Sequence, residues 1–161
     1  MKPIDGIVID YNDDWTLMQS NPADYVTDGY AIVRNKNIKE FQRGDGEKWR
    51  EKIIKLKGQG KPGQVKVPLD NLEKILKSLT KKFGVFTLYT KEDGICWLGR
   101  LKSIDDKLLT IDDFTTKGKW SGQEDFKVND IRVIEFDTDY INSLKLVSKK
   151  YGAKRAAANK S

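Results

Sequence analysis

The stretch of residues 85–105, VFTLYTKEDGICWLGRLKSID, carries the pattern that decides the fold. Residues 85–89 and 95–104 are rich in β-branched, aromatic and other apolar residues, which favour strands. Between them lies Glu92-Asp93-Gly94, a sequence typical of a tight turn, because glycine readily adopts the positive φ that such a turn requires. The stretch therefore predicts two adjacent strands joined by a short turn.

Further strands are expected on both sides of this pair. Short apolar or alternating runs separated by polar turns occur at 7–9, 15–17, 30–33, 64–67, 108–111, 126–128 and 131–136. Residues 112–123 contain Gly118 and Gly122 beside Trp120, and they are expected to form a loop.

Three helices are predicted from apolar residues at helical spacing. The first begins at Asp45, with Trp49, Ile53 and Leu56 on one face. The second is expected over residues 70–83, with Asp70 as N-cap and Gly84 as the C-terminal stop. Its apolar stripe comprises Leu72, Ile75, Leu76, Leu79 and Phe83. The third is expected over residues 138–151 and should end at Gly152, with a disordered tail over 153–161.

The two strand-rich blocks can be superposed at an offset near 93 residues. Gly6 then meets Gly99, and Asn37-Ile38 meets Asp130-Ile131. Each block is followed by a predicted helix. Similar blocks of short strands within one chain favour a repeated small barrel.

The second block resembles the Sm/Lsm family. Helix 70–83 leads into strand 85–89 and the Asp93-Gly94 turn, and residues 99–105, GRLKSID, are similar to the Gly-x-Leu-x-x-hydrophobic-Asp stretch of that family. The second family signature is better matched in the first block, at residues 33–38, VRNKNI, where Asn35 stands in place of glycine.

This resemblance implies an α+β protein, mainly β with α, built from two strongly bent five-stranded Sm-like barrels joined by helices. We expect residues 1–67 to form the first barrel with its trailing helix. Residues 68–152 should form the second barrel with its leading and trailing helices, and residues 153–161 a basic tail. The first block lacks a strand ahead of Gly6, so we hypothesise that residues 64–67 fold back and close the first barrel.

Composition excludes several classes of enzyme. The chain has 161 residues, no histidine and one cysteine, Cys96. Catalytic triads with histidine and His-containing zinc sites are therefore impossible. The pairs Asp13-Asp14, Asp105-Asp106 and Asp112-Asp113 leave a metal-dependent hydrolase as a weak alternative, although turn aspartates are common for conformational reasons. We expect a non-catalytic protein without metal or cofactor.

The net charge of +6 is unevenly distributed. Residues 1–40 and 99–139 each carry a net charge of −3, whereas 41–98 and 140–161 each carry +6. The positive charge thus lies on the predicted helices and tail, and the strand blocks are acidic. Acidic strand blocks are poorly suited to contact phosphate.

Six residues are candidates for ligand binding. The family resemblance implies that Arg34 contacts a base, with Asp14 near the position of the family's base-binding asparagine and Lys127 at the arginine position of the second block. Asn35, beside Arg34, is a further candidate. Tyr30 and Trp120, like Tyr25 and Phe114, lie in or beside long loops where exposed rings could stack on bases or contact a peptide, and Lys119 adjoins Trp120. Structural roles remain open: Arg34 could pair with Asp28 or Glu40, and Trp120 could cover a barrel mouth.

The sequence favours a non-enzymatic binding or regulatory module whose partner is another protein. The alternative is an Sm-like protein that binds RNA or single-stranded nucleic acid. The chain has no apolar run of membrane-spanning length and no leader pattern, so the cytoplasm is the expected compartment and no membrane contact is expected. Its oligomeric state stays open.

Overall fold

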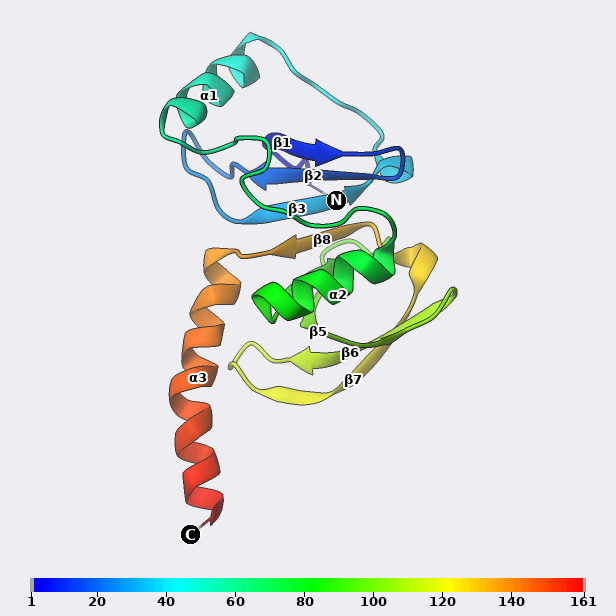
Figure 1. Ribbon diagram of the computed structural model, residues 1–161, viewed down its shortest axis with the longest axis vertical. Helices are drawn as coiled ribbons and strands as arrows, with labels where there is room; N and C mark the ends of the chain where they lie inside the picture. The colour runs from blue at the N-terminus through cyan, green and yellow to red at the C-terminus, as the bar shows by residue number, and fades with distance from the viewer. Residues whose placement is uncertain (1, 161) are drawn as a thin grey trace.

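The strands of the protein form one antiparallel sheet. The computed structural model describes residues 2–160, with side chains placed for residues 2–151. Within that range the strand order is β1-β2-β3-β8-β4-β5-β6-β7. The strands are β1 (Gly6–Tyr11), β2 (Trp15–Ser20), β3 (Tyr30–Arg34), β4 (Phe86–Tyr89), β5 (Cys96–Ile104), β6 (Leu108–Phe114), β7 (Trp120–Lys127) and β8 (Val133–Phe136). Figure 1 shows the sheet running from β1 at one end to β7 at the other.

Helices lie along the face and sides of this sheet. They are α1 (Asp45–Leu56), α2 (Leu72–Phe83) and α3 (Asp139–Lys160), with short 3-10 helices η1 (Asn35–Asn37) and η2 (Val128–Asp130). Helix α2 packs against the middle of the sheet, and α3 extends alongside its second half (Figure 1). The mixed α and β composition that the sequence predicts is confirmed.

Helix α2 forms where its sequence predicts. Its apolar stripe is buried except for the half-buried Phe83, and Gly84 ends the helix with a φ of 82°. The N-cap is Asn71, one residue after the predicted Asp70, because the side chain of Asn71 accepts a hydrogen bond from the backbone N–H of Lys74.

The main core runs through the whole sheet. Buried side chains of β1, β2 and β3 pack together with those of α2, β4, β6 and β8 in one cluster. The β3–β8 ladder, which pairs Tyr30 with Phe136 and Val33 with Val133, joins the two halves of the sheet. A smaller cluster of Val85, Leu98, Phe114 and Ile141 attaches α3.

The pairing of β1, β2 and β3 recurs in β5, β6 and β7 at an offset of 93 residues. The pair Gly6–Ser20 corresponds to Gly99–Asp113, and all ten pairs of the two ladders follow this rule. The irregularity between residues 8 and 10 of β1 also recurs, between residues 101 and 103 of β5. Helices η1 and η2 occupy equivalent places after β3 and β7. The two segments therefore have the same strand register and the same bend.

Two closed barrels are not formed. The sheet is open, because among the described residues β1 pairs with β2 alone and β7 with β6 alone. The hypothesis that residues 64–67 close the first barrel is wrong, since that segment is irregular. The Gln64 side chain instead holds the segment in place by donating a hydrogen bond to the Tyr30 hydroxyl at 2.8 Å.

Two other expectations also fail. Residues 112–123 are not a loop: β6 and β7 continue through them and turn at residues 115–119, where Thr115 N–H donates to the Lys119 carbonyl at 2.8 Å. Polar residues are tolerated there because β7 is an exposed edge strand. Helix α3 does not end at Gly152 but runs to Lys160. Ser161 lies outside the described residues.

Candidate functional site

Arg34 joins the two halves of the sheet and is not free to bind a base. Its Nε donates to the carbonyl of Ile131 and a terminal nitrogen donates to the carbonyl of Val128, both at 2.8 Å. The guanidinium carbon lies 4.4 Å from the centre of the Trp15 ring. Burial lowers the pKa of Arg34, and the nearby Asp14 partly offsets this effect. The predicted pairing with Asp28 or Glu40 is replaced by backbone contacts.

Asn35 and Tyr30 are also engaged within the fold. The Asn35 amide nitrogen donates to the carbonyl of Asn12, and its oxygen accepts from the Thr16 hydroxyl, both at 2.7 Å. Tyr30 is 8% exposed and stacks on Phe136, with 5.2 Å between ring centres. The prediction that Tyr30 presents an exposed ring is wrong, because its place on β3 turns it toward the core.

Trp120 is half-exposed on β7 but packed between two neighbours. The Arg100 guanidinium carbon lies 3.9 Å from the Trp120 ring centre, and the Phe114 ring lies 4.7 Å away. Arg100 in turn pairs with Asp112 at 3.0 Å. Phe114, which the sequence placed on a loop, is buried. The Trp120 indole is therefore held in place rather than presented on a flexible loop.

The structure does not bring the six predicted residues together. Lys127 and Lys119 are both exposed but lie at opposite ends of β7. Arg34 contacts η2, which directly follows Lys127 at one end of β7, whereas Trp120 lies at the other end of that strand.

An exposed group of apolar side chains lies on α1 and the loop beside it. Trp49 is 56% exposed and Leu56 is 80% exposed. The Trp49 indole N–H donates to the Tyr25 hydroxyl at 3.3 Å, and Val26 beside Tyr25 is also exposed. We call Tyr25, Val26, Trp49, Ile53 and Leu56 the α1 surface.

The sequence predicts this stripe as one face of the helix but does not show what covers it. Trp49, Ile53 and Leu56 have the spacing of a packing face, yet Ile54 is the buried residue of α1 at 1% exposure. Ile54 lies on the side of α1 that faces Gly60, and Gly60 in turn lies close to Ile7 of β1. Periodicity predicts a stripe, but only the tertiary contacts decide whether the protein itself covers it.

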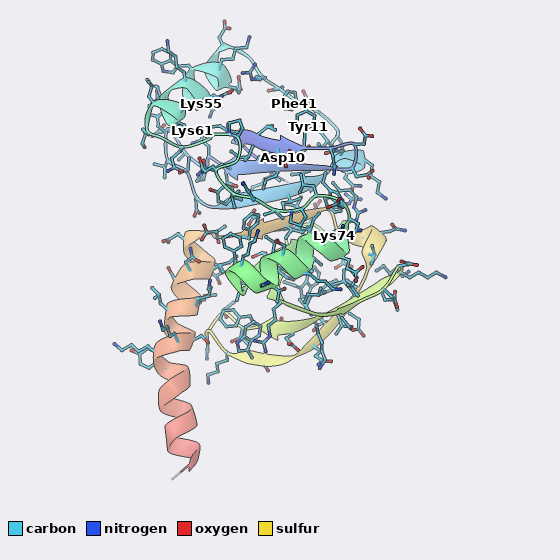
Figure 2. The ribbon with its side chains drawn as sticks, viewed as in Figure 1. Asp10, Tyr11, Phe41, Lys55, Lys61 and Lys74 are labelled. Atoms are coloured by element: carbon cyan, nitrogen blue, oxygen red, sulfur yellow. The ribbon has the colours of Figure 1, made fainter. Side chains whose placement is uncertain are left out.

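Basic side chains flank the α1 surface. A hollow of about 430 Å³ is lined by Arg43, Lys48, Glu51, Lys52, Lys55 and Leu56. Glu51 pairs with Arg43 at 3.0 Å and with Lys55 at 2.8 Å, and these cations lower the pKa of Glu51. The Lys52 ammonium lies 5.9 Å from the Trp49 ring centre. The apolar stripe is thus bordered by positive charge, and Figure 2 shows Lys55 on α1.

A titratable cluster lies on β4, β5 and β8. The Tyr89 hydroxyl donates to Glu135 Oε2 at 3.1 Å. Burial raises the pKa of Glu135, of Tyr89 and of the Cys96 thiol. Cys96 itself is an exposed residue at the start of β5. Within residues 2–160, no group of three or more Asp, Glu or Cys side chains is arranged to hold a metal ion.

No helix in the described part of the chain combines the length and apolar character that crossing a membrane requires. Comparison of the chain with protein-family models, curated proteins and solved structures gave no match.

Proposed function

We propose that this protein is a non-enzymatic binding module that docks another protein on the α1 surface. The single observation that carries the proposal is the exposure of Trp49 and Leu56 on one stripe of α1. Tryptophan and tyrosine are enriched among residues that dominate protein interfaces, and contiguous exposed apolar patches mark interaction sites. The surrounding Arg43, Lys48 and Lys52 favour a partner with an apolar centre and an acidic rim.

The stripe favours protein over nucleic acid. A tryptophan ring can stack on a base, but Leu56 and Val26 offer nothing to a nucleotide and much to an apolar side chain. Arg34 and the Trp120 ring, on which the nucleic-acid alternative depended, are occupied by intramolecular contacts. Nucleic-acid binding would now have to depend on the lysines of the helices. It predicts that the protein binds oligonucleotides with an affinity that falls steeply as salt concentration rises.

We also propose that each half is a divergent Sm-like unit. Support comes from the order helix, four strands, 3-10 helix and strand in residues 72–136, and from the recurrence of the β1–β3 register at an offset of 93 residues. Fold likeness does not assign a ligand, so the functional proposal depends on the α1 surface itself.

A photo-crosslinking amino acid at position 49 tests the docking function. Placed there in cells, it should give a discrete adduct that protease removes and nuclease does not. The same group at Lys81, an exposed α2 position, serves as control and should not give that adduct. Leu56→Asp should abolish the adduct, because it places a charge in the apolar stripe. A nuclease-sensitive adduct, or an adduct equally strong from position 81, would contradict the proposal.

Stability measurements separate docking from a structural role of Trp49. Trp49→Ala should change the free energy of unfolding by less than about 0.5 kcal/mol, the usual range for exposed positions. Ile54→Ala, on the buried side of the same helix, should cost about 2–4 kcal/mol. If both substitutions destabilise equally, Trp49 supports the fold and the docking proposal is wrong.

A further inference from the structure

Strand β3 lies inside the sheet, with β2 on one side and β8 on the other. Its side away from β2 carries β8, paired antiparallel from Tyr30–Phe136 to Val33–Val133. At the end of this ladder the backbone N–H of Arg34 donates to the carbonyl of Arg132 at 2.9 Å. The N–H of Asn35 points the other way, to the carbonyl of Asp14 on the β2 side.

Strand β7 has the same geometry with its outer edge open. The pairs of β7 with β6 from residues 123 to 127 match those of β3 with β2 from residues 30 to 34, each shifted by 93 residues. Val128 N–H donates to the carbonyl of Lys107, as Asn35 N–H does to Asp14. By alternation along the strand, the N–H groups of Gln123, Asp125 and Lys127 face away from β6. In β3 the equivalent groups face β8.

The side chains of β7 define what could pair there. Glu124 and Asp125 lie next to each other on an exposed strand, followed by Phe126, whose ring lies 5.1 Å from Trp97. Side chains alternate between the two faces, so Glu124 and Phe126 share one face and Asp125 lies on the other. An added strand that pairs with β7 as β8 pairs with β3 would have residues opposite Phe126, which is apolar, and opposite Asp125 and Glu124, which are acidic.

Within residues 2–160, no strand pairs with this edge of β7. The segment that corresponds to β8 by the 93-residue offset is 40–43, which would place Glu40 opposite Phe126 and Phe41 opposite Asp125. Both pairings are unfavourable, because they place a carboxylate against an aromatic ring and put no cation directly opposite Asp125 or Glu124. Charged edge residues also discourage pairing between identical edges.

We propose that the outer edge of β7 accepts an extended, basic segment of a partner protein as a ninth strand, in the register that β8 has on β3. The backbone N–H and C=O groups of residues 123–127 would bind the partner strand, and Glu124 and Asp125 would select lysine or arginine opposite them. The inference extends the proposed protein-binding function to a second surface, whose residues are distinct from the α1 surface.

Peptide titration followed by backbone amide resonances tests this site. The probe is a peptide containing Val-Lys-Arg-Thr, which places valine opposite Phe126 and the two cations opposite Asp125 and Glu124. We expect shifts and slowed hydrogen exchange at the amides of Gln123, Asp125 and Lys127. A matched peptide with Glu-Glu in place of Lys-Arg should leave these amides unchanged.

Two variants separate backbone pairing from charge. Asp125→Pro removes an outward N–H and should weaken binding at least about tenfold relative to Asp125→Ala, which lacks the same carboxylate but keeps the N–H. Glu124→Lys leaves the backbone intact and should reduce the preference for the basic peptide over the acidic one, which keeps the test valid if the proline variant does not fold.

The outcomes that overturn the proposal are specific. They are equal binding by the Pro and Ala variants, no protection of the three amides, or protection that rises with protein concentration without peptide, which would mean that copies pair through β7. If these results are found but the crosslink from position 49 is still formed, the β7 proposal is wrong and docking on the α1 surface stands. If only the crosslink is lost, docking on the α1 surface is wrong and the β7 proposal stands.

Discussion

Glu135 shows at the residue scale how the fold changes the behaviour of one ionisable group. Its carboxylate lies on β8 between β3 and β4 and accepts a hydrogen bond from Tyr89. Burial raises the pKa of Glu135, the hydrogen bond from Tyr89 lowers it, and the negative charge of Asp28 raises it further, with a net rise. The ionised form is therefore less favourable in the folded protein than in the unfolded chain.

Glu135→Gln should stabilise the protein more at neutral than at acidic pH. Below the unfolded pKa, about 4.3 for glutamate, the carboxyl is protonated in both states and imposes no penalty. As the pH rises from there through the raised pKa of the folded state, the folded protein binds more protons than the unfolded chain, so its stability falls. Glutamine removes the charge and keeps an acceptor for Tyr89.

Urea unfolding of both proteins between pH 4 and 8 measures this effect. The difference in unfolding free energy between Glu135→Gln and the unmodified protein should grow from about pH 4 upward and then level off. A difference that does not change over this range would show that ionisation of Glu135 does not limit stability.

At the scale of elements, strands β1 and β5 each carry a glycine where the backbone of the neighbouring strand leaves no room for a Cβ atom. A methyl group at Gly6 would lie 2.5 Å from the carbonyl oxygen of Gln19, and one at Gly99 would overlap the carbonyl oxygen of Asp112. Both clashes involve backbone atoms, which cannot move without disturbing the ladder. The glycines sit at equivalent places just before the irregularities of the two strands.

Gly99→Ala should therefore destabilise the protein by about 1–3 kcal/mol, in the range for overpacked positions. Gly46→Ala is the control, because a methyl group at Gly46 in α1 meets no atom within 4 Å and alanine has the higher helix propensity. Thermal unfolding should show a lowered Tm for the first variant and an unchanged or raised Tm for the second. Equal values would mean that the approach of β5 to β6 is not tightly constrained.

At the scale of the whole molecule, Arg34 and the continuous core make the two halves one structure. The side chain of Arg34 leaves the end of β3 and holds two carbonyls around η2, more than 90 residues later in the chain. Buried residues of both halves belong to the same cluster. The two segments with equal register are thus expected to unfold together.

Arg34→Ala should lower the unfolding free energy by about 2–4 kcal/mol, because it removes the side-chain donor of two charge-assisted hydrogen bonds to the carbonyls of Val128 and Ile131. Arg34→Lys should have an intermediate effect, since an ammonium group lacks the planar fork that reaches both oxygens. Tryptophan fluorescence and far-UV circular dichroism should report coincident transitions in each protein. Separate transitions for the two probes would show that the halves fold independently.

Local sequence signals predicted much of the fold. The boundaries of α1 and the stripe of α2 follow from helical spacing. The turn at Gly94 follows from the sequence Glu92-Asp93-Gly94, and the structure gives Gly94 the positive φ, 79°, that such a turn requires. The failures occur where the outcome depends on distant contacts. Residues 120–123 of β7 fall in the predicted loop 112–123, because an exposed edge strand has no apolar alternation that would reveal it.

The candidate site was predicted less well, for the same reason. Arg34, Tyr30 and Asn35 were chosen for chemistry that free side chains could perform, and the fold uses each of them for internal contacts. Trp49 and Leu56 lie on the predicted apolar face of α1, but their spacing does not show whether that face is covered, and the tertiary structure leaves it exposed.

The sequence by itself determined the helices and most strands, the absence of histidine chemistry and the 93-residue spacing of two similar segments, because these follow from residue type and local periodicity. Only the tertiary structure decided that the strands join in one open sheet, that Arg34 is occupied, and that α1 and β7 present free surfaces. Those outcomes depend on which elements meet across long stretches of chain, and strand pairing and burial between distant segments leave no local signal.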